Sequence, residues 1–191
     1  MSDNLQKNPW KTLSGDLKYE NPWIRITEFQ VLNPNGNAGI YGVVHFKNVA
    51  VGILPIDADG NTWLVGQYRY TLNEYHWEIP EGGSPIGKES PLETAKRELL
   101  EETALVATQW TELLKIHTSN SVTDEVGYVF LAKGLTEGIA APEDTEDLKL
   151  WKLPLSEAIE MAMHGKITDS MSIAALLKAK VLQDKGLLCN V

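Results

Sequence analysis

The chain has 191 residues, and 43% of them are apolar, which is enough to build one packed domain with a small N-terminal appendage. Its formal net charge is -9 and no basic stripe is visible, so a nucleic-acid polymer is not expected as a partner. No apolar run approaches the ~18 residues that span a membrane, and the start of the chain lacks the apolar core of a signal peptide. Because the only cysteine is Cys189, no disulfide framework can form, and we expect a reducing, cytoplasmic environment.

The N-terminal quarter predicts a β-hairpin. Residues 1–20 are polar with isolated apolar anchors. Residues 23–31 are enriched in strand-forming side chains with partial alternation, and residues 40–46 form a second candidate strand. Residues 33–36, with the sequence NPNG, give a dense turn signal between them. We therefore expect residues 22–47 to form a hairpin placed before the main sheet.

The rest of the chain alternates between strands and a few helices. Further strands are predicted at residues 51–56, 62–69, 76–79, 110–117, 127–133 and 149–153. Residues 80–83 are expected to lead through a tight loop into a first helix. Two later helices are predicted at residues 156–164 and 170–182, the last with Asp169 or Ser170 as N-cap. Strands, one helix, strands and then helices indicate an α+β fold or an αβα sandwich.

The first helix has the clearest local signals. Ser90 can act as N-cap, Pro91 suits the first helical position, and Glu93 completes a capping box. Residues suited to burial then recur at helical spacing, at Leu92, Ala95, Leu99 and Thr103.

The other sides of this helix are acidic in a way that local rules disfavour. Glu98 and Glu102 are four residues apart, so two like charges share one face at a cost of about 0.2–0.5 kcal/mol. They also lie towards the helix C-terminus, where the helix dipole prefers cations. Glutamates one turn apart are separated by roughly 6 Å of axial rise, so their carboxylates can converge on one or two divalent cations. Oxygen ligands of this kind suit Mg²⁺ or Mn²⁺, and the alternative is an acidic, solvated helix face.

The spacing of eight residues around this helix resembles the signature of the Nudix hydrolases. That signature is Gly, five residues, Glu, seven residues, and then Arg-Glu-apolar-x-Glu-Glu-x-Gly-apolar. The matching residues here are Gly83, Glu89, Arg97, Glu98, Leu99, Glu101, Glu102 and Leu105. The one departure is Ala104, which stands where the family has glycine. If the backbone there keeps a negative φ the change has little effect, and if it is a helix C-cap with positive φ, alanine costs about 1 kcal/mol and leaves the ligands in place.

Two further segments resemble the branch of the family that contains ADP-ribose pyrophosphatases and nucleoside-diphosphate-sugar hydrolases. They are residues 67–70, QYRY, and residues 77–83, WEIPEGG. The resemblance implies a Nudix-type αβα sandwich with a mixed central sheet, in which residues 1–47 form an N-terminal extension and dimerisation hairpin and residues 48–191 the Nudix hydrolase domain. It implies Mg²⁺-dependent hydrolysis, with Mn²⁺ as a possible substitute, of the diphosphate bond of ADP-ribose or ADP-, GDP- or UDP-sugars. The products would be a nucleoside monophosphate and a sugar phosphate.

The resemblance also assigns roles to residues. The implied metal ligands are the carbonyl of Gly82 and the carboxylates of Glu98, Glu101 and Glu102. Gly83, Glu89 and Arg97 are implied to be structural, with the last two forming a pair that braces the loop against the helix.

Substrate-binding and catalytic roles are implied for five further residues. Arg69 would contact the diphosphate, although an ordinary surface arginine on a strand is the alternative, and Glu78 is also assigned to substrate binding. Trp23 and Tyr41 would sandwich the nucleobase, one ring from each subunit of a homodimer, unless both are core or interface residues. Glu125 is the candidate general base or an additional metal ligand, and joins Glu98 and Glu102 as a catalytic residue, unless it is an ordinary loop carboxylate.

The sequence leaves alternatives open for the substrate and for whether the protein is an enzyme. The loop of residues 118–125 has Asn120 and Ser121 where this branch usually carries proline and glycine, which weakens a preference for ADP-ribose and favours other nucleotide sugars. Dinucleoside polyphosphates or capped RNA are other possible substrates. A non-catalytic sensor that binds a nucleotide sugar is the alternative outside enzymes.

Overall fold

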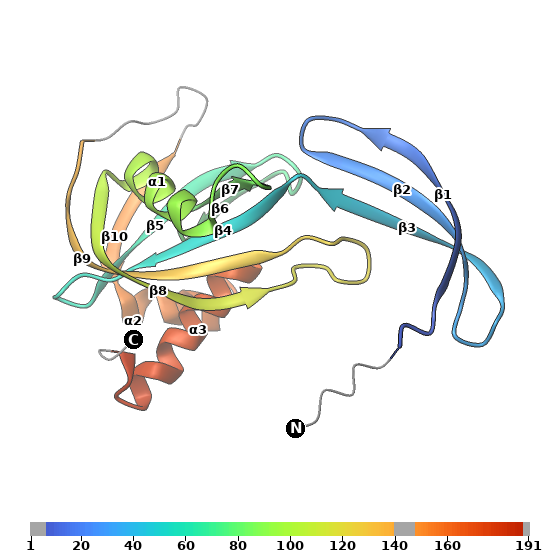
Figure 1. The fold of residues 1–191 in the computed structure, drawn as a ribbon. Helices are drawn as coiled ribbons and strands as arrows, with labels where there is room; N and C mark the ends of the chain where they lie inside the picture. The colour runs from blue at the N-terminus through green and yellow to red at the C-terminus, as the bar shows by residue number, and fades with distance from the viewer. Residues whose placement is uncertain (1–6, 140–147, 189–191) are drawn as a thin grey trace. The chain divides into compact units, whose positions relative to one another are not determined.

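The computed structural model describes residues 7–139 and 148–188 (Figure 1). Its contacts divide the chain into two compact units. The N-terminal unit contains the described residues up to Lys47 together with Ser119–Glu125, and the core unit contains Asn48–Thr118 and the described residues from Val126 onward. Cys189 lies outside the described residues. Within them, none of the helices has the length and apolar character that a membrane span requires.

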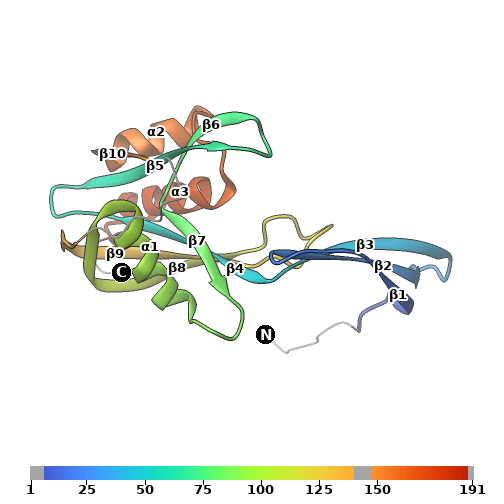
Figure 2. The same ribbon diagram turned by 90° about the horizontal axis from the view of Figure 1, so that it is seen from above.

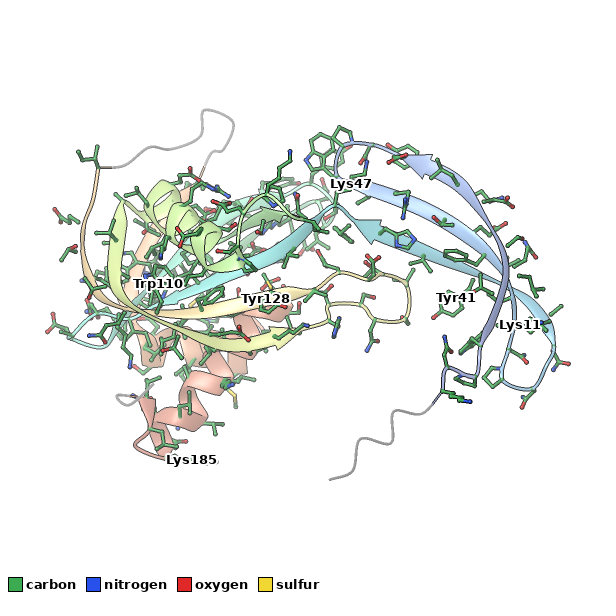
Figure 3. All side chains as sticks on the ribbon, viewed as in Figure 1. Lys11, Tyr41, Lys47, Trp110, Tyr128 and Lys185 are labelled. Carbon is green, nitrogen blue, oxygen red and sulfur yellow. The ribbon has the colours of Figure 1, made fainter. Side chains whose placement is uncertain are left out.

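The N-terminal unit is a three-stranded antiparallel sheet in the order β1-β2-β3. The predicted hairpin is present as β2 (Ile24–Leu32) and β3 (Ala38–Phe46). The side chain of Asn33 accepts hydrogen bonds from the N–H groups of Asn35 and Asn37, which closes the turn between the two strands. Figure 3 shows Tyr41 on β3.

The strand β1 (Lys11–Glu20) is an element that the sequence did not predict. It pairs with β2 along its length, but its register shifts twice, between Thr12 and Ser14 and between Leu17 and Tyr19. These irregularities break the two-residue period by which a strand is recognised. All ten of its residues are also exposed, so no apolar face marks it in the sequence.

The core unit contains two sheets and three helices, and confirms the predicted α+β class with a mixed sheet. The four-stranded sheet has the order β7-β4-β9-β8, with β4 and β9 parallel and the other pairs antiparallel. The three-stranded sheet has the order β10-β5-β6. The strands are β4 (Asn48–Pro55), β5 (Asn61–Arg69), β6 (Glu74–Glu78), β7 (Glu81–Pro85), β8 (Leu105–Ile116), β9 (Gly127–Glu137) and β10 (Lys149–Pro154). The helices are α1 (Pro91–Thr103), α2 (Leu155–Met163) and α3 (Ser170–Asp184).

The four-stranded sheet is buried on both faces, as the sandwich prediction requires. On β4, Val51 and Ile53 belong to an apolar cluster that includes Leu99 of α1. Leu54, which follows Ile53 and points to the other face, belongs to a second cluster that includes Leu176 of α3. Figure 2 shows α1 on one side of this sheet and α2 and α3 on the other. The alternation along β4 therefore places α1 and α3 on opposite faces of one sheet.

The strand β7 corrects the prediction of a loop before α1. Glu81–Pro85 pairs antiparallel with β4, so that Gly82 lies opposite Val51. Two glycines and a proline give this stretch a low strand propensity. Because β7 lies at the edge of the sheet, these residues are tolerated there.

The hairpin of β8 and β9 is longer than predicted. Its pairing extends from Leu105 opposite Glu137 to Ile116 opposite Gly127. The prediction left out residues 105–109, although LVATQ is largely apolar, and residues 134–137, where GLTE has a single apolar side chain. Pairing between the two strands extends the hairpin over both segments.

Candidate active site

The helix α1, which carries the predicted metal ligands, is capped at both ends. Ser90 is the N-cap, and its side chain accepts a hydrogen bond from the N–H of Glu93, as predicted. Ala104 is the C-cap with φ of 57° and donates its N–H to the carbonyl of Leu100. The second of the two alternatives for Ala104 therefore holds, in which alanine occupies a left-handed conformation at a cost of about 1 kcal/mol.

Glu98 and Gly82, two of the predicted metal ligands, lie in direct contact. A Cβ atom added to Gly82 would lie 1.9 Å from Oε1 of Glu98. The Glu98 carboxylate thus packs directly against the Gly82 backbone, and only glycine leaves room for it. The same requirement lets a backbone group approach a small ion closely.

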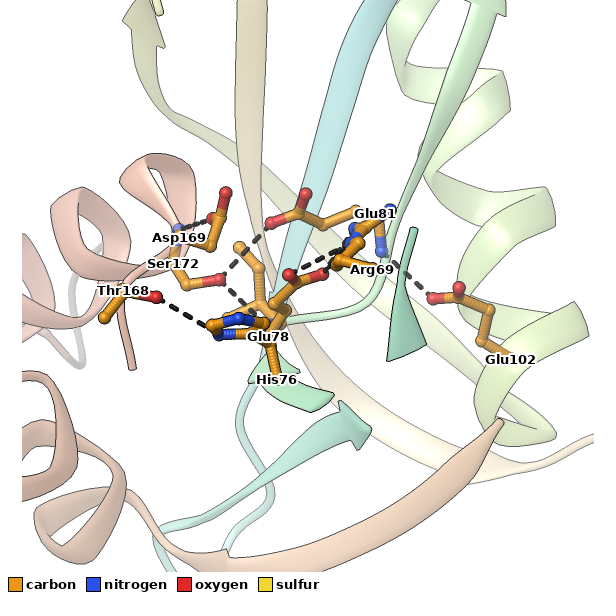
Figure 4. A network of polar contacts seen from close by, with 9 residues as sticks. Arg69, His76, Glu78, Glu81, Glu102, Thr168, Asp169 and Ser172 are labelled. Atoms are coloured by element: carbon orange, nitrogen blue, oxygen red, sulfur yellow. Dashed lines mark hydrogen bonds and ion pairs between the residues drawn. The ribbon is translucent and has the colours of Figure 1, made fainter. Parts of the chain in front are cut away.

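Glu102 reaches the same end of β7. Its Oε2 accepts a hydrogen bond of 3.0 Å from the N–H of Glu81, the residue before Gly82 (Figure 4). The two helix glutamates that share a face in the sequence therefore both contact the first residues of β7. An oxygen donor set of two carboxylates beside a closely approached backbone is the chemistry that Mg²⁺ and Mn²⁺ prefer.

Arg97 organises the remaining acidic residues of the signature. Its guanidinium lies 2.8 Å from Glu98, 2.7 Å from Glu101 and 3.5 Å from Glu89. The predicted contact between Arg97 and Glu89 is present, and Thr94 donates a further hydrogen bond to Glu89. Burial alone would lower the pKa of Arg97, but its contacts with Glu101 and Glu98 raise the pKa above its ordinary value. In residues 7–139 and 148–188, no group of three or more His, Cys, Asp or Glu side chains is already gathered as a metal site.

Arg69 and Glu78, both predicted to bind substrate, form an ion pair. The Nε of Arg69 donates to both carboxylate oxygens of Glu78, at 3.1 and 3.0 Å, and Nη2 donates to one of them. Glu78 is buried, while the side chain of Arg69 is 37% exposed. Burial alone would lower the pKa of Arg69, but Glu78 raises it. Arg69 is therefore held in place by a carboxylate rather than lying free on the surface.

Three residues beside this pair were not identified as site residues from the sequence. The buried hydroxyl of Ser172, on α3, donates to Glu81 at 3.3 Å, and Asp169 caps α3 by accepting the N–H of Ser172 at 2.7 Å (Figure 4). Burial, followed by the charge of Asp169, raises the pKa of Glu81 well above its ordinary value. The sequence identified Asp169 as a possible helix cap, but gave no sign that α3 packs beside β7.

The N-terminal unit carries the other predicted residues. Trp23 is 65% exposed, so it is not a core residue of this chain. The ring of Tyr41 packs edge-on against Trp10 at 5.5 Å, and its hydroxyl donates to the carbonyl of Ser121 at 2.8 Å.

The loop that carries Glu125 belongs to the same unit. The N–H of Val44 on β3 donates to the carbonyl of Val122 at 2.9 Å, and Nδ1 of His45 lies 2.6 Å from Asp124. The N–H of Glu125 itself donates to the Thr123 hydroxyl at 3.0 Å. The roles of Trp23, Tyr41 and Glu125 stay predictions.

Two family models match successive parts of the chain. Residues 10–44 match the nucleoside diphosphate sugar hydrolase N-terminal domain, and residues 46–172 match the NUDIX domain. The chain belongs to the Nudix family. The predicted family and the predicted enzyme class, a Nudix hydrolase, are thereby confirmed.

Relatives of this Nudix hydrolase span nearly its whole length. It is 33% identical over 177 residues to an ADP-ribose pyrophosphatase of Mycobacterium tuberculosis, covering 91% of this chain and 84% of the relative. It is 31% identical over 168 residues to a methanol dehydrogenase activator of Bacillus methanolicus, covering 87% of this chain and 90% of the relative. A crystal structure of an ADP compounds hydrolase shares the fold, with a TM-score of 0.82 at 23% identity over 97% of this chain and 100% of that one.

Proposed function

We propose that this Nudix protein hydrolyses the diphosphate bond of nucleoside diphosphate sugars, ADP-ribose included, with Mg²⁺ as cofactor and Mn²⁺ as a possible substitute. The observation that carries the proposal is the contact of Glu98 with Gly82, next to the bond from Glu81 to Glu102. The matched N-terminal domain and the relatives named ADP-ribose pyrophosphatase support the substrate class.

The metal would be held by oxygen ligands from α1 and β7. The proposed donors are the carbonyl of Gly82 and the carboxylates of Glu98 and Glu102, with Glu101 as a further donor. When bound there, divalent cations supply neutralisation of the charge that develops on the diphosphate and lower the pKa of a bound water. The close packing of Glu98 against Gly82 and the hydrogen bond from Glu81 to Glu102 support this role.

The other residues would bind and orient the substrate. The planar fork of Arg69 suits the oxygens of a diphosphate, and Glu78 keeps that fork in one orientation. Trp23 and Tyr41 would stack on the nucleobase, an interaction worth ~1–3 kcal/mol for each base.

The reaction needs one water and one proton acceptor. The water oxygen forms a bond to one phosphorus while the bond from that phosphorus to the bridging oxygen breaks, and the bridging oxygen leaves with the other phosphate. The proton of the water goes to Glu125, or to a glutamate of α1, acting as general base. A loop carboxylate suits this task because it can close over bound substrate.

We further propose that the protein is a cytoplasmic homodimer formed through the N-terminal unit. All residues of β1 are exposed, and several of the exposed side chains of this unit are large and apolar, namely Leu13, Leu17, Tyr19, Trp23 and Ile40. Apolar surface of this kind is typical of a protein interface. A monomeric mass in solution would count against a nucleobase site shared by two subunits.

A panel of nucleotide sugars tests the proposal. ADP-ribose and ADP-, GDP- and UDP-sugars, with a dinucleoside polyphosphate and capped RNA for comparison, are incubated with Mg²⁺ or Mn²⁺ in ¹⁸O-water, and the products are resolved by phosphorus NMR. We expect a nucleoside monophosphate and a sugar phosphate, with ¹⁸O on the phosphorus that the water attacked. Faster turnover of dinucleoside polyphosphates or capped RNA would contradict the substrate class.

A regulatory role is the second candidate, because one relative is named a methanol dehydrogenase activator. A protein that only senses nucleotide sugars would bind members of the panel without turning them over. Equilibrium binding measured beside the NMR assay separates the two functions.

A further inference from the structure

The hydroxyl of Ser172 is a buried polar group of the core unit. Ser172 lies in the first turn of α3 and has no exposed surface. A buried hydroxyl is costly unless it is hydrogen-bonded. Ser172 has two partners on one segment, since it accepts the N–H of Ile79 at 3.0 Å and donates to Oε1 of Glu81 at 3.3 Å (Figure 4).

The segment that Ser172 holds leads directly into the proposed metal site. Ile79 and Pro80 connect β6 to β7, and Glu81 and Gly82 are the first two residues of β7. The carbonyl of Pro80 accepts a hydrogen bond of 2.8 Å from the N–H of Ile53 on β4. The segment is thus bonded to α3, to β4 and, through Glu102, to α1.

The Ser172 side of this connection is itself anchored. Asp169 caps α3 by accepting the N–H of Ser172, and Ala175 and Leu176 in the next turn are fully buried. A hydroxyl on the first turn of a capped and packed helix has little freedom to move. It can therefore fix the position of Ile79 and Pro80, which belong to no strand, and with them the start of β7.

We propose that Ser172 is a positioning residue for the metal site, and that its hydroxyl sets where the backbone of Gly82 lies relative to Glu98 and Glu102. The inference rests on the proposed metal-dependent function. It assigns a part of the site to α3, some 90 residues beyond β7 in the sequence. Without the hydroxyl, the N–H of Ile79 loses its partner and the side chain of Glu81 loses a donor, so the segment before Gly82 is less constrained.

The test compares Ser172→Ala with Ser170→Ala in the full chain. Ser170 lies in the same turn of α3 but is exposed, which makes it a matched control. Mn²⁺ binding is titrated by electron paramagnetic resonance, and kcat and KM are measured for ADP-ribose over a range of Mg²⁺ concentrations. For Ser172→Ala we expect Mn²⁺ affinity and kcat to fall by about tenfold, which is the usual effect of losing a group that orients a metal ligand. KM should stay within about twofold of the parent, because Arg69 and Glu78 are not in contact with the lost group.

A second pair of variants isolates the hydroxyl from packing. Ser172→Thr and Ser172→Val place side chains of nearly equal size at the same position, and only the threonine keeps the hydroxyl. We expect Ser172→Thr to bind Mn²⁺ more tightly than Ser172→Val by about the same tenfold factor. Equal Mn²⁺ affinities in this pair would overturn the proposal.

The outcomes separate this inference from the proposed function. A folded Ser172→Ala protein with the parent's Mn²⁺ affinity and kcat would show that Ser172 only stabilises the fold, even if its melting temperature falls. If the parent binds Mn²⁺ but hydrolyses none of the nucleotide sugars, the proposed substrate class fails, while the Mn²⁺ titrations still decide the role of Ser172. If the parent binds no Mn²⁺, both proposals fail.

Discussion

Two clusters of carboxylates meet at Gly82, and each contains one arginine. Glu98 of the first cluster contacts the backbone of Gly82, and Glu81 of the second cluster precedes it in the chain. In the first, Arg97 is shared among Glu89, Glu98 and Glu101, all from the signature and with side chains 13–28% exposed. In the second, Arg69 pairs with Glu78, and Glu81 is left beside Asp169.

The two clusters use different means to keep negative charges together. In the first, a shared guanidinium and access to solvent limit the repulsion, so the carboxylates can still be offered to a cation. In the second, burial and the neighbouring charge of Asp169 raise the pKa of Glu81, which disfavours a further negative charge beside Glu78 and Asp169. In the proposed function, Glu98 and Glu101 of the first cluster would be metal donors, while Glu78 of the second cluster holds Arg69 in one orientation.

The largest expected effect comes from neutralising the acidic face of α1. Glu98→Gln and Glu102→Gln should each lower kcat by about 10²–10⁴-fold, because each removes a charged ligand from the metal site. The fold should survive, as judged by circular dichroism and melting temperature. Glu93→Gln is the control, since Glu93 is exposed on the same helix and contacts Lys96. Near-normal turnover in both variants would refute the assignment of Glu98 and Glu102 to the metal site.

Gly82→Ala tests the contact between α1 and β7 without changing any charge. Because the new Cβ would lie 1.9 Å from Oε1 of Glu98, either the side chain or β7 must move. We expect a fall in kcat of at least about tenfold and a loss of about 1–3 kcal/mol in the free energy of unfolding, measured by urea titration. Gly39→Ala is the control, because no atom lies within 4 Å of a Cβ at that position. Equal kcat values for parent and Gly82→Ala would mean that Glu98 does not need to lie against this backbone.

Asp57 can be compared with the proposed metal ligands, because it is a carboxylate that is stabilised by protein groups, Lys152 and Asn61. Burial alone would raise its pKa, but hydrogen bonds from Lys152 and Asn61 outweigh burial and lower the pKa from 3.8 to about 2. A carboxylate with a lowered pKa stabilises the fold above the pKa of the unfolded state, and that contribution is lost as the pH falls towards 2.

Asp57→Asn should therefore lower the free energy of unfolding by about 1 kcal/mol at pH 7, an amount reduced by solvent screening. The difference between parent and variant should shrink between about pH 4 and pH 2, when urea unfolding is followed over a pH series. Asp59→Asn, in the same turn, is the control. A difference that stays constant down to pH 2 would contradict the role of the charge.

The smallest effect is expected at the end of α1. Ala104→Gly removes a side chain from a residue with φ of 57°, so the free energy of unfolding should rise by about 0.5–1 kcal/mol. Because the helix glutamates keep their positions, kcat should not change. Urea unfolding and a standard turnover assay measure both quantities, and a change in kcat would show that Ala104 also shapes the site.

Sequence was informative where the determinants of structure lie close together along the chain. The N-cap Ser90, the contact of Arg97 with Glu89 and three of the four positions of α1 predicted to be buried all lie within one loop and one helix, and the structure shows each of them. The fourth position, Leu92, is only partly buried. The same holds for the hairpin of β2 and β3, where Asn33 closes the turn.

The features that were missed have no local pattern that would reveal them. β7 consists of residues with poor strand propensity and forms because β4 supplies the pairing. β1 has no buried face to reveal it. The bonds that Ser172 makes to Ile79 and Glu81 join residues more than 90 positions apart, and no local pattern predicts which side of the sheet α3 covers.

The place of α3 against the β6–β7 connection also bears on how shortened homologous chains should be judged. A truncation that ends before Asp169 would leave every letter of the Nudix signature intact while deleting the cap and the hydroxyl that brace it. If Ser172 positions the metal site as proposed, a chain that carries the whole signature but lacks α3 would not be an active pyrophosphatase. The presence of α3, with Asp169 and Ser172, would distinguish complete sites from truncated ones.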